Sequence, residues 1–293
     1  MPGKQVTELD ALPSFTDTSL LPVHNGAGLK KGLLSQLANY LGTKFSNPNL
    51  LINPDFKINQ RGATSYEKQG YSVDRWKIWN VTVTPSTSGE ITVKNDKYTD
   101  TGTFLQYLES ATEGDSTLSC YVTSVSGTVT MVADDNSQVI LKQGLNVVHT
   151  SKSTKTFTIF LNRGTSVTLK WVKLEQGTMA TSFIAPSPVE EYPKCQRYFQ
   201  YISKLYCVPL IYTKSLINAS DKFFQATNGN FPREMRTKPT LTYKTLGQSD
   251  NSTFTGSASF EFDSKSINTV TLDRAINNFT ITINSINLDA EIY

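Results

Sequence analysis

The stretch NLLINPDFKINQRGATSYEKQGYSVDRWKIW, residues 49–79, decides the fold of this chain. Residues 50–52 are apolar, and this segment ends at Asn53-Pro54-Asp55, because proline fixes φ and Asn and Asp favour turns. Residues 56–59 and 74–79 then alternate apolar and polar side chains, which is the period-2 pattern of half-buried strands. The stretch therefore predicts three strands of an all-β domain that begins near residue 48.

Polar side chains interrupt this apolar pattern at two places, and we expect them to have a structural role. An arginine can lie flat over an indole ring while a carboxylate accepts its N–H groups. One arrangement puts Arg61 or Arg75 over Trp76, with Asp74 as the acceptor. The other is a buried Asp74–Arg75 ion pair that locks the first strands together. The residues of this structural motif are Asn59, Gln60, Arg61, Asp74, Arg75 and Trp76.

The composition of the 293-residue chain agrees with a β fold. It contains 13 Tyr and 15 Phe together with abundant Thr, Ser and Asn, while helical tracts of Ala, Leu, Glu and Lys are nearly absent. A chain of this length holds two or three domains, each able to bury its own core. We therefore expect an all-β protein with more than one domain.

The charge and hydropathy of the chain indicate which classes of binding partner to expect. The net charge is +3 with scattered basic and acidic residues, so no block of charge is present to neutralise a row of phosphates or an anionic membrane. No segment approaches the ~18–20 apolar residues of a membrane span, and residues 1–10 lack the apolar core of a signal peptide. We expect no nucleic-acid partner, no membrane insertion and synthesis in a cytoplasm.

Three regions differ in their patterns. Residues 1–47 predict a small unit with a strand at 20–23, a turn at 24–28 and a helix over 33–41. This unit has too little apolar surface to fold alone, so it either docks on the next domain or contacts other copies. Residues 48–187 predict a β-sandwich with a jelly-roll-like fold, and residues 188–293 predict a second one, after a linker marked by Pro186, Pro188 and Pro193.

Alternation and turn signals place the strands of both sandwiches. In the central region they are residues 82–83, 90–94, 103–108, 118–124, 128–133, 138–141, 144–149, 156–161 and 166–174. In the last region they are residues 197–202, 206–211, 221–226, 240–243, 257–263, 269–272, 279–283 and 288–292. Residues 134–137 predict a hairpin turn, because they lack the further carboxylates that a calcium site requires.

The three cysteines, Cys120, Cys195 and Cys207, have no CxxC spacing, and any pairing leaves one of them over. This pattern argues against a disulfide framework and against a zinc site. We interpret them as small buried hydrophobic residues, with a Cys195–Cys207 bridge as the alternative. No metal and no cofactor are expected.

Several of these segments resemble one family. NPDF (53–56), INQRG (58–62) and DRW (74–76) resemble the opening of a module in tail-fibre and receptor-binding proteins of bacteriophages. WVKLEQG (171–177) and TMATSF (178–183) resemble its closing strand, which is also similar to that of jelly-roll carbohydrate-binding modules. Three further segments of this chain resemble the C-terminal domain of many phage tail-fibre proteins: EEYPKCQRYFQ (190–200), FPREMRTKPT (231–240) and LDAE (288–291).

The resemblance implies a place and partners for the chain. TELDAL (7–12) and KKGLLSQLANYL (30–41) resemble the unit by which phage tail proteins attach to the tail, so residues 1–47 are expected to contact other tail or baseplate proteins. The family implies a homotrimer, although no heptad repeat supports this. It also implies a location in the virion tail, after synthesis in the cytoplasm of a bacterial host, and a host surface polysaccharide as the receptor.

Aromatic and polar side chains suited to sugars are abundant. Tyr and Trp rings stack on the apolar face of a pyranose, and Asn, Gln, Asp and Arg bind its hydroxyls. Weak single-site affinity for a sugar would be offset by the multivalency of a fibre. The candidate glycan-binding residues are Tyr66, Tyr71, Trp79, Tyr98, Tyr107 and Tyr212.

Signals of catalysis are missing. The chain has two histidines, far apart, and contains no HExxH, GxSxG, P-loop or Rossmann glycine pattern. The sequence therefore predicts a non-catalytic receptor-binding protein. A purely structural tail or baseplate component is the first alternative. A polysaccharide depolymerase is the second, because glycosidases need only two carboxylates.

Overall fold

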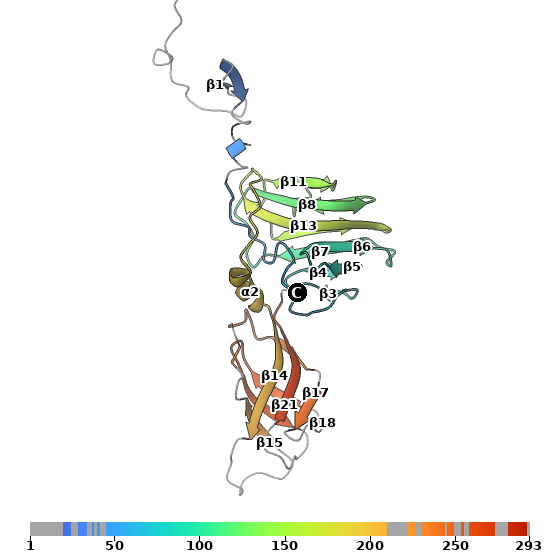
Figure 1. Cartoon of the computed structure of the whole chain (residues 1–293), viewed down its shortest axis with the longest axis vertical. Coiled ribbons are helices and arrows are strands. Elements are labelled where there is room, and N and C mark those ends of the chain that lie inside the picture. Colours follow the sequence, from blue (N-terminus) through green and yellow to red (C-terminus); the bar gives the residue numbers. More distant parts are fainter. Residues whose placement is uncertain are drawn as a thin grey trace, which may run out of the picture.

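The computed structural model describes residues 20–24, 29–33, 37, 40–41, 45–209, 222–226, 230–231, 233–243, 245–248, 253–254, 258–272 and 281–291. The described residues form mainly antiparallel sheets, so the all-β prediction is confirmed. Along the long axis of the molecule, β1 is followed by a central sandwich, by helix α2 and by a C-terminal sheet (Figure 1).

The N-terminal region contains a hairpin. β1 (Leu20–His24) pairs antiparallel with β2 (Leu29–Leu33). The strand predicted at 20–23 is therefore confirmed, while β2 occupies residues that were not predicted to be a strand. Within the predicted helix, the described residues Leu37, Tyr40 and Leu41 are helical.

The central sandwich consists of two facing antiparallel sheets. One has the order β10-β9-β12-β7-β4-β3 and the other β11-β8-β13-β6-β5. All nine strands predicted between residues 82 and 174 are confirmed. The strands are β3 (Gly70–Tyr71), β4 (Lys77–Trp79), β5 (Thr82–Pro85), β6 (Ile91–Asn95), β7 (Gly102–Tyr107), β8 (Ser116–Ser126), β9 (Val129–Val132), β10 (Gln138–Ile140), β11 (Gly144–Thr150), β12 (Thr156–Leu161) and β13 (Thr165–Gln176).

Trp76 lies in the middle of the core between the two sheets and is fully buried. Its indole stacks on Phe104 at 4.6 Å between ring centroids, and the rings of Phe56 and Phe157 meet it at 5.3 and 5.9 Å. The indole Nε1 donates to the carbonyl of Asn53 at 2.9 Å, so its single polar atom is satisfied.

The opening stretch is less regular than its sequence pattern predicts. Residues 50–52 and 56–59, both predicted to be strands, contain no strand, and of residues 74–79 only Lys77–Trp79 is a strand. Asn53, Phe56 and Arg75 have φ of 56°, 58° and 72°, in the left-handed region, which no strand includes. The Asn53 side chain replaces a strand partner, since its Nδ2 donates to the Ile58 carbonyl at 2.8 Å and its Oδ1 accepts from the Ile58 N–H at 3.0 Å.

The two ends of the central sandwich lie together. The N–H of Leu50 donates to the carbonyl of Leu174 in β13 at 2.8 Å. Asn49 supplies the remaining bonds with its side chain, which donates to the Val172 carbonyl at 3.0 Å and accepts from the Leu174 N–H at 3.1 Å. One asparagine thus substitutes for a regular strand ladder.

The predicted linker contains a helix, α2 (Pro188–Gln196). Pro188 occupies its first turn, where the missing N–H costs nothing, and Glu190 and Glu191 lie in the same turn. The helix was not predicted, and it contains two of the three linker prolines, Pro188 and Pro193. α2 lies between the central sandwich and the C-terminal sheet (Figure 1).

The C-terminal sheet has eight strands in the order β18-β17-β21-β14-β15-β20-β19, with β16 also paired to β21. Each pair of strands predicted at 197–211 and at 279–292 forms one long strand, and β17 and β18 were not predicted. The strands are β14 (Phe199–Pro209), β15 (Lys222–Ala226), β16 (Thr240–Thr242), β17 (Thr245–Gln248), β18 (Thr253–Phe254), β19 (Ala258–Phe262), β20 (Ile267–Leu272) and β21 (Ile281–Asp289).

This sheet curls over its own core. Tyr243 is next to β16, which pairs with β21, and Phe260 belongs to β19, which lies beyond β14, β15 and β20 in the order, yet their ring centroids are 5.4 Å apart. Both rings pack on a core that includes Ile283, Ile286 and Leu288 of β21. The prediction of a sandwich-like second β unit is therefore confirmed, with one curled sheet supplying both layers.

Cys120 and Cys195 are free and buried, so the alternative of a Cys195–Cys207 bridge is wrong. Burial raises the pKa of the Cys120 thiol to about 12 and also raises that of Cys195. We expect a Cys207→Ser variant to show no thiol reactive with Ellman's reagent in native buffer and two after guanidinium unfolding. Rapid labelling of the native variant would contradict this assignment.

Candidate functional site

The solvent face of the six-stranded sheet carries a row of side chains that crosses five strands. Trp79 of β4 pairs with Thr103 of β7, and Thr103 pairs on its other side with Phe160 of β12. Phe160 in turn pairs with Thr130 of β9, and Thr130 pairs with Ile140 of β10. We call these five residues the outer row. They face solvent because the alternate residues of the same strands lie in the core.

The outer row is apolar and exposed. Trp79, Phe160 and Ile140 are 50%, 37% and 56% exposed, although all three are large hydrophobic residues. Trp79 and Phe160 are two strands apart, roughly 10 Å at the usual strand spacing. Threonine hydroxyls lie between the apolar side chains. An extended ligand lying across the strands can therefore touch both rings and bind polar groups between them.

Two further candidate residues lie on the same face. Tyr71 of β3 pairs with Lys77 of β4, and Lys77 pairs with Leu105 of β7, two residues before Tyr107. The Lys77 ammonium is 5.5 Å from the centroid of the Tyr107 ring. Trp79, Tyr71 and Tyr107 thus share one surface, as three of the six predicted glycan-binding residues.

Two of the other three candidates are elsewhere. Tyr66 is half-buried against the core, where its hydroxyl donates to Oδ1 of Asn59. The Tyr98 hydroxyl donates to the backbone carbonyl of Glu67 at 2.5 Å. Tyr212 lies outside the described residues. Phe160 and Ile140 were missed, because only the strand register shows that they align with Trp79.

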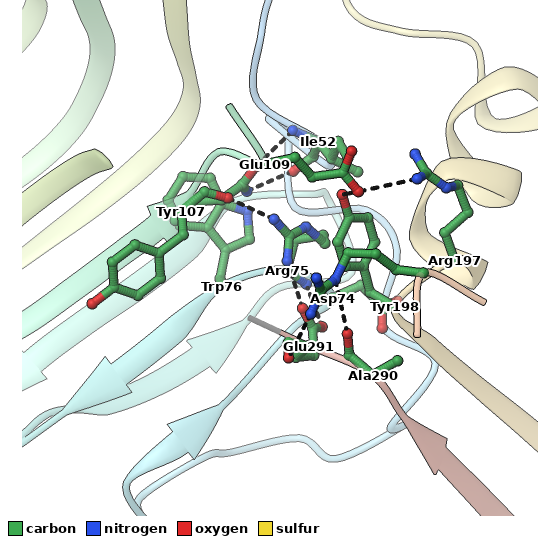
Figure 2. A network of polar contacts seen from close by, with 12 residues as sticks. Ile52, Asp74, Arg75, Trp76, Tyr107, Glu109, Arg197, Tyr198, Ala290 and Glu291 are labelled. Carbon is green, nitrogen blue, oxygen red and sulfur yellow. Dashed lines mark hydrogen bonds and ion pairs between the residues drawn. The ribbon is translucent and has the colours of Figure 1, made fainter. Parts of the chain in front are cut away.

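The polar residues of the opening stretch meet the C-terminal sheet (Figure 2). Arg75 is 1% exposed, and its Nη1 donates to the Glu291 carboxylate at 2.7 Å. Its Nη2 donates to the Tyr107 carbonyl at 2.6 Å, and its guanidinium lies 3.6 Å from the centroid of the Tyr198 ring. The predicted Asp74–Arg75 pair is therefore wrong, since Arg75 binds a carboxylate that lies 216 residues away.

Arg61 makes the second link across this contact. Its guanidinium lies 3.9 Å from the centroid of the Phe199 ring and pairs with Asp74 at 3.4 Å and with Asp289 at 3.3 Å. Gln60 adds a bond from its Nε2 to the Phe199 carbonyl at 2.8 Å. The prediction that an arginine lies on Trp76 is wrong, because Phe rings enclose the indole and both guanidinium groups lie on rings of the C-terminal region.

We call the cluster of Arg61, Asp74, Arg75, Tyr198, Asp289 and Glu291 the joint. Its three carboxylates outnumber its two guanidinium groups, and Asp74 is fully buried. The pKa of the Asp74 carboxyl is raised to about 7, mainly by burial and also by the nearby Glu291 charge, while Arg61 and the Gln60 N–H oppose the rise. The joint fixes the C-terminal sheet against the central sandwich.

The geometry offers no site for a metal within the described residues, where no group of three or more His, Cys, Asp or Glu converges. The predicted hairpin turn at 134–137 is present, and its carboxylates bind protein. Asp135 accepts from the Ser137 N–H at 2.9 Å, and Asp134 accepts from the Lys155 N–H at 2.6 Å. Among the described helices, none is long and apolar enough to cross a bilayer.

Sequence and structure comparisons name no family. No protein-family model and no curated protein matches the chain. Among solved structures it is similar to PfGH50B, with a TM-score of 0.25 and 9% identity over 59% of this chain and 38% of that one. It is also similar to discoidin II of Dictyostelium discoideum, with a TM-score of 0.22 and 10% identity over 87% and 98% of the two chains. The chain thus spans well under half of PfGH50B, and at these TM-scores neither similarity carries an argument.

Proposed function

We propose that the chain is a phage tail-fibre or receptor-binding protein that attaches the virion to a glycan on the host cell surface without cleaving it. The observation that carries the proposal is the outer row, where Trp79 and Phe160 present exposed rings on a rigid sheet with threonine hydroxyls between them. Exposed aromatic rings on a paired sheet are suited to the apolar faces of sugar rings. The resemblance of the opening, closing and C-terminal segments to phage proteins supplies the biological setting.

The attachment role belongs to residues 1–47. Leu37 and Leu41 are 42% and 40% exposed, an apolar surface that a second copy or a tail protein would bury. A homotrimer would give a mass in solution of three times 32.5 kDa. Light scattering after size exclusion measures this directly, and a monomeric mass would contradict the trimer.

A glycan array with Trp79→Ala tests the proposed function. We expect the wild type to bind one class of bacterial surface saccharide and the variant to lose at least about tenfold in affinity, or about 1.4 kcal/mol, because the most exposed ring of the outer row is removed. Tyr121→Ala is the matched control, since Tyr121 is an aromatic residue 39% exposed on the five-stranded sheet. It should bind as the wild type does.

Two outcomes separate the alternatives. Equal loss in Trp79→Ala and Tyr121→Ala would contradict a sugar site on the outer row. Absence of binding by the wild type, while the protein still assembles into virions, would favour a purely structural tail component. Release of reducing ends from host polysaccharide would favour a depolymerase instead.

A further inference from the structure

A cleft of about 570 Å³ lies beside the joint and is lined by two of its residues, Arg75 and Tyr198. It is within the range of about 300–1,000 Å³ that is typical of small-molecule sites, and such sites favour domain interfaces. The central sandwich contributes the segment from Gln106 to Glu113, and the chain after α2 contributes Arg197 and Tyr198. Residues of both parts therefore line the cleft.

Polar groups converge on this cleft. Arg75 lines it and is 1% exposed, and its Nε is a buried donor with no hydrogen-bond partner, whereas its Nη1 and Nη2 are both bonded. The Nε atom is itself buried, so it is not open to a molecule in the cleft. Glu109 is held at the rim, where it accepts from the Tyr198 hydroxyl at 2.5 Å and from Arg197 at 3.1 Å.

The lining suits a neutral polyhydroxylated molecule. Arg75 and Arg197 line the cleft together with Glu109 and Glu113. Because the residues of opposite charge are equal in number, the lining as a whole favours neither an anionic nor a cationic ligand. A hydroxyl both donates and accepts, and it can use either kind of group. Apolar side chains supply the remaining wall, which suits the non-polar face of a sugar ring: Leu50, Ile52, Leu108 and Ala111.

We propose that this cleft is a second saccharide site, separate from the outer row, in which the Glu109–Arg197 pair binds the hydroxyls of an uncharged sugar. The ligand class rests on the proposed function. Because the C-terminal region forms one wall of the cleft, a bound sugar also holds the two parts together and stabilises the joint.

Filling the cleft tests the proposal. Ala111 lies on its wall and is exposed, so Ala111→Trp occludes the space without touching the joint. Ser88→Trp, at an exposed turn, is the matched control. On an array of neutral and acidic bacterial saccharides, followed by calorimetry with the best binder, we expect Ala111→Trp to weaken binding of a neutral saccharide at least about tenfold. Ser88→Trp should leave it unchanged.

Glu113→Gln distinguishes ligand charge, because it removes one carboxylate and fills no space. A neutral sugar should bind this variant somewhat less tightly, whereas tighter binding of an acidic saccharide would overturn the neutral assignment. Unchanged binding by Ala111→Trp together with loss in Trp79→Ala would overturn the cleft site and leave the proposed function standing. Binding by no saccharide at all would overturn both, and loss in Ala111→Trp alone would place the receptor site in the cleft instead of on the outer row.

Discussion

Replacing Glu291 with glutamine is expected to lower the free energy of unfolding by about 3–5 kcal/mol. The substitution leaves the Arg75 guanidinium buried with no opposing carboxylate at 2.7 Å, and an uncompensated buried charge costs about that much. Both side chains of this pair are at most 1% exposed, so solvent cannot replace the lost partner. Guanidinium denaturation followed by tryptophan fluorescence measures the loss, since Trp76 follows Arg75 directly in the chain.

Glu67→Gln is the matched control for this prediction. Glu67 also pairs with a cation, Lys97, at 2.5 Å, but both side chains are 50% exposed. An exposed ion pair contributes about 0–1 kcal/mol, because water screens it and replaces it. Equal effects of the two substitutions would show that the joint does not hold the two parts together.

The importance of the charged residues in the opening stretch was predictable, and their partners were not. Charge inside an apolar pattern indicates a buried network, because an unpaired charge there is costly. Yet Arg75 has φ of 72°, in the left-handed region, and its side chain binds Glu291 and not the neighbouring Asp74. A contact across 216 residues depends on how two folded units dock, and no local pattern encodes that.

The bounds of a strand were predicted best where the alternation of core-facing and solvent-facing side chains is the only feature that defines it. Residues 156–161 are predicted and observed with the same bounds, because every second side chain enters the core. Where side chains replace backbone partners, as Asn49 and Asn53 do, the alternation persists without a strand. Helix α2 was missed because its two prolines, Pro188 and Pro193, resemble a linker in sequence.

The residues of the candidate site were also predicted only in part. Trp79 is a large apolar residue next to the turn residue Asn80, and its exposure of 50% agrees with its selection from sequence. Phe160 belongs to a strand whose core-facing residues are also apolar, so its outward direction was hidden. The pairing register brings Phe160 beside Thr103 and hence near Trp79, and register is a property of the assembled sheet.

The joint also predicts an unusual response to pH, through Asp74. Its carboxyl has a pKa of about 7 in the folded chain against an ordinary value of 3.8. Between these values the folded state keeps a proton that the unfolded state has released, so the contribution to stability is complete below pH 3.8 and is lost as the pH rises through about 7. Arg61 and Glu291 are the charged groups that act on the Asp74 carboxyl, and they shift its pKa in opposite directions.

Asp74→Asn should remove this dependence, because asparagine has the shape of the protonated acid and does not titrate. The difference in unfolding free energy between the wild type and the variant is expected to fall by about 4 kcal/mol from pH 4 to pH 8, at ~1.4 kcal/mol for each pH unit between the two pKa values.

Asp135→Asn is the control, because the pKa of Asp135 is shifted in the opposite direction. The Ser137 N–H lowers the pKa of Asp135, so its contribution is lost as the pH falls. Parallel curves for the wild type and Asp74→Asn from pH 4 to pH 8 would mean that Asp74 is ionised in the folded joint at neutral pH, with Arg61 offsetting its burial.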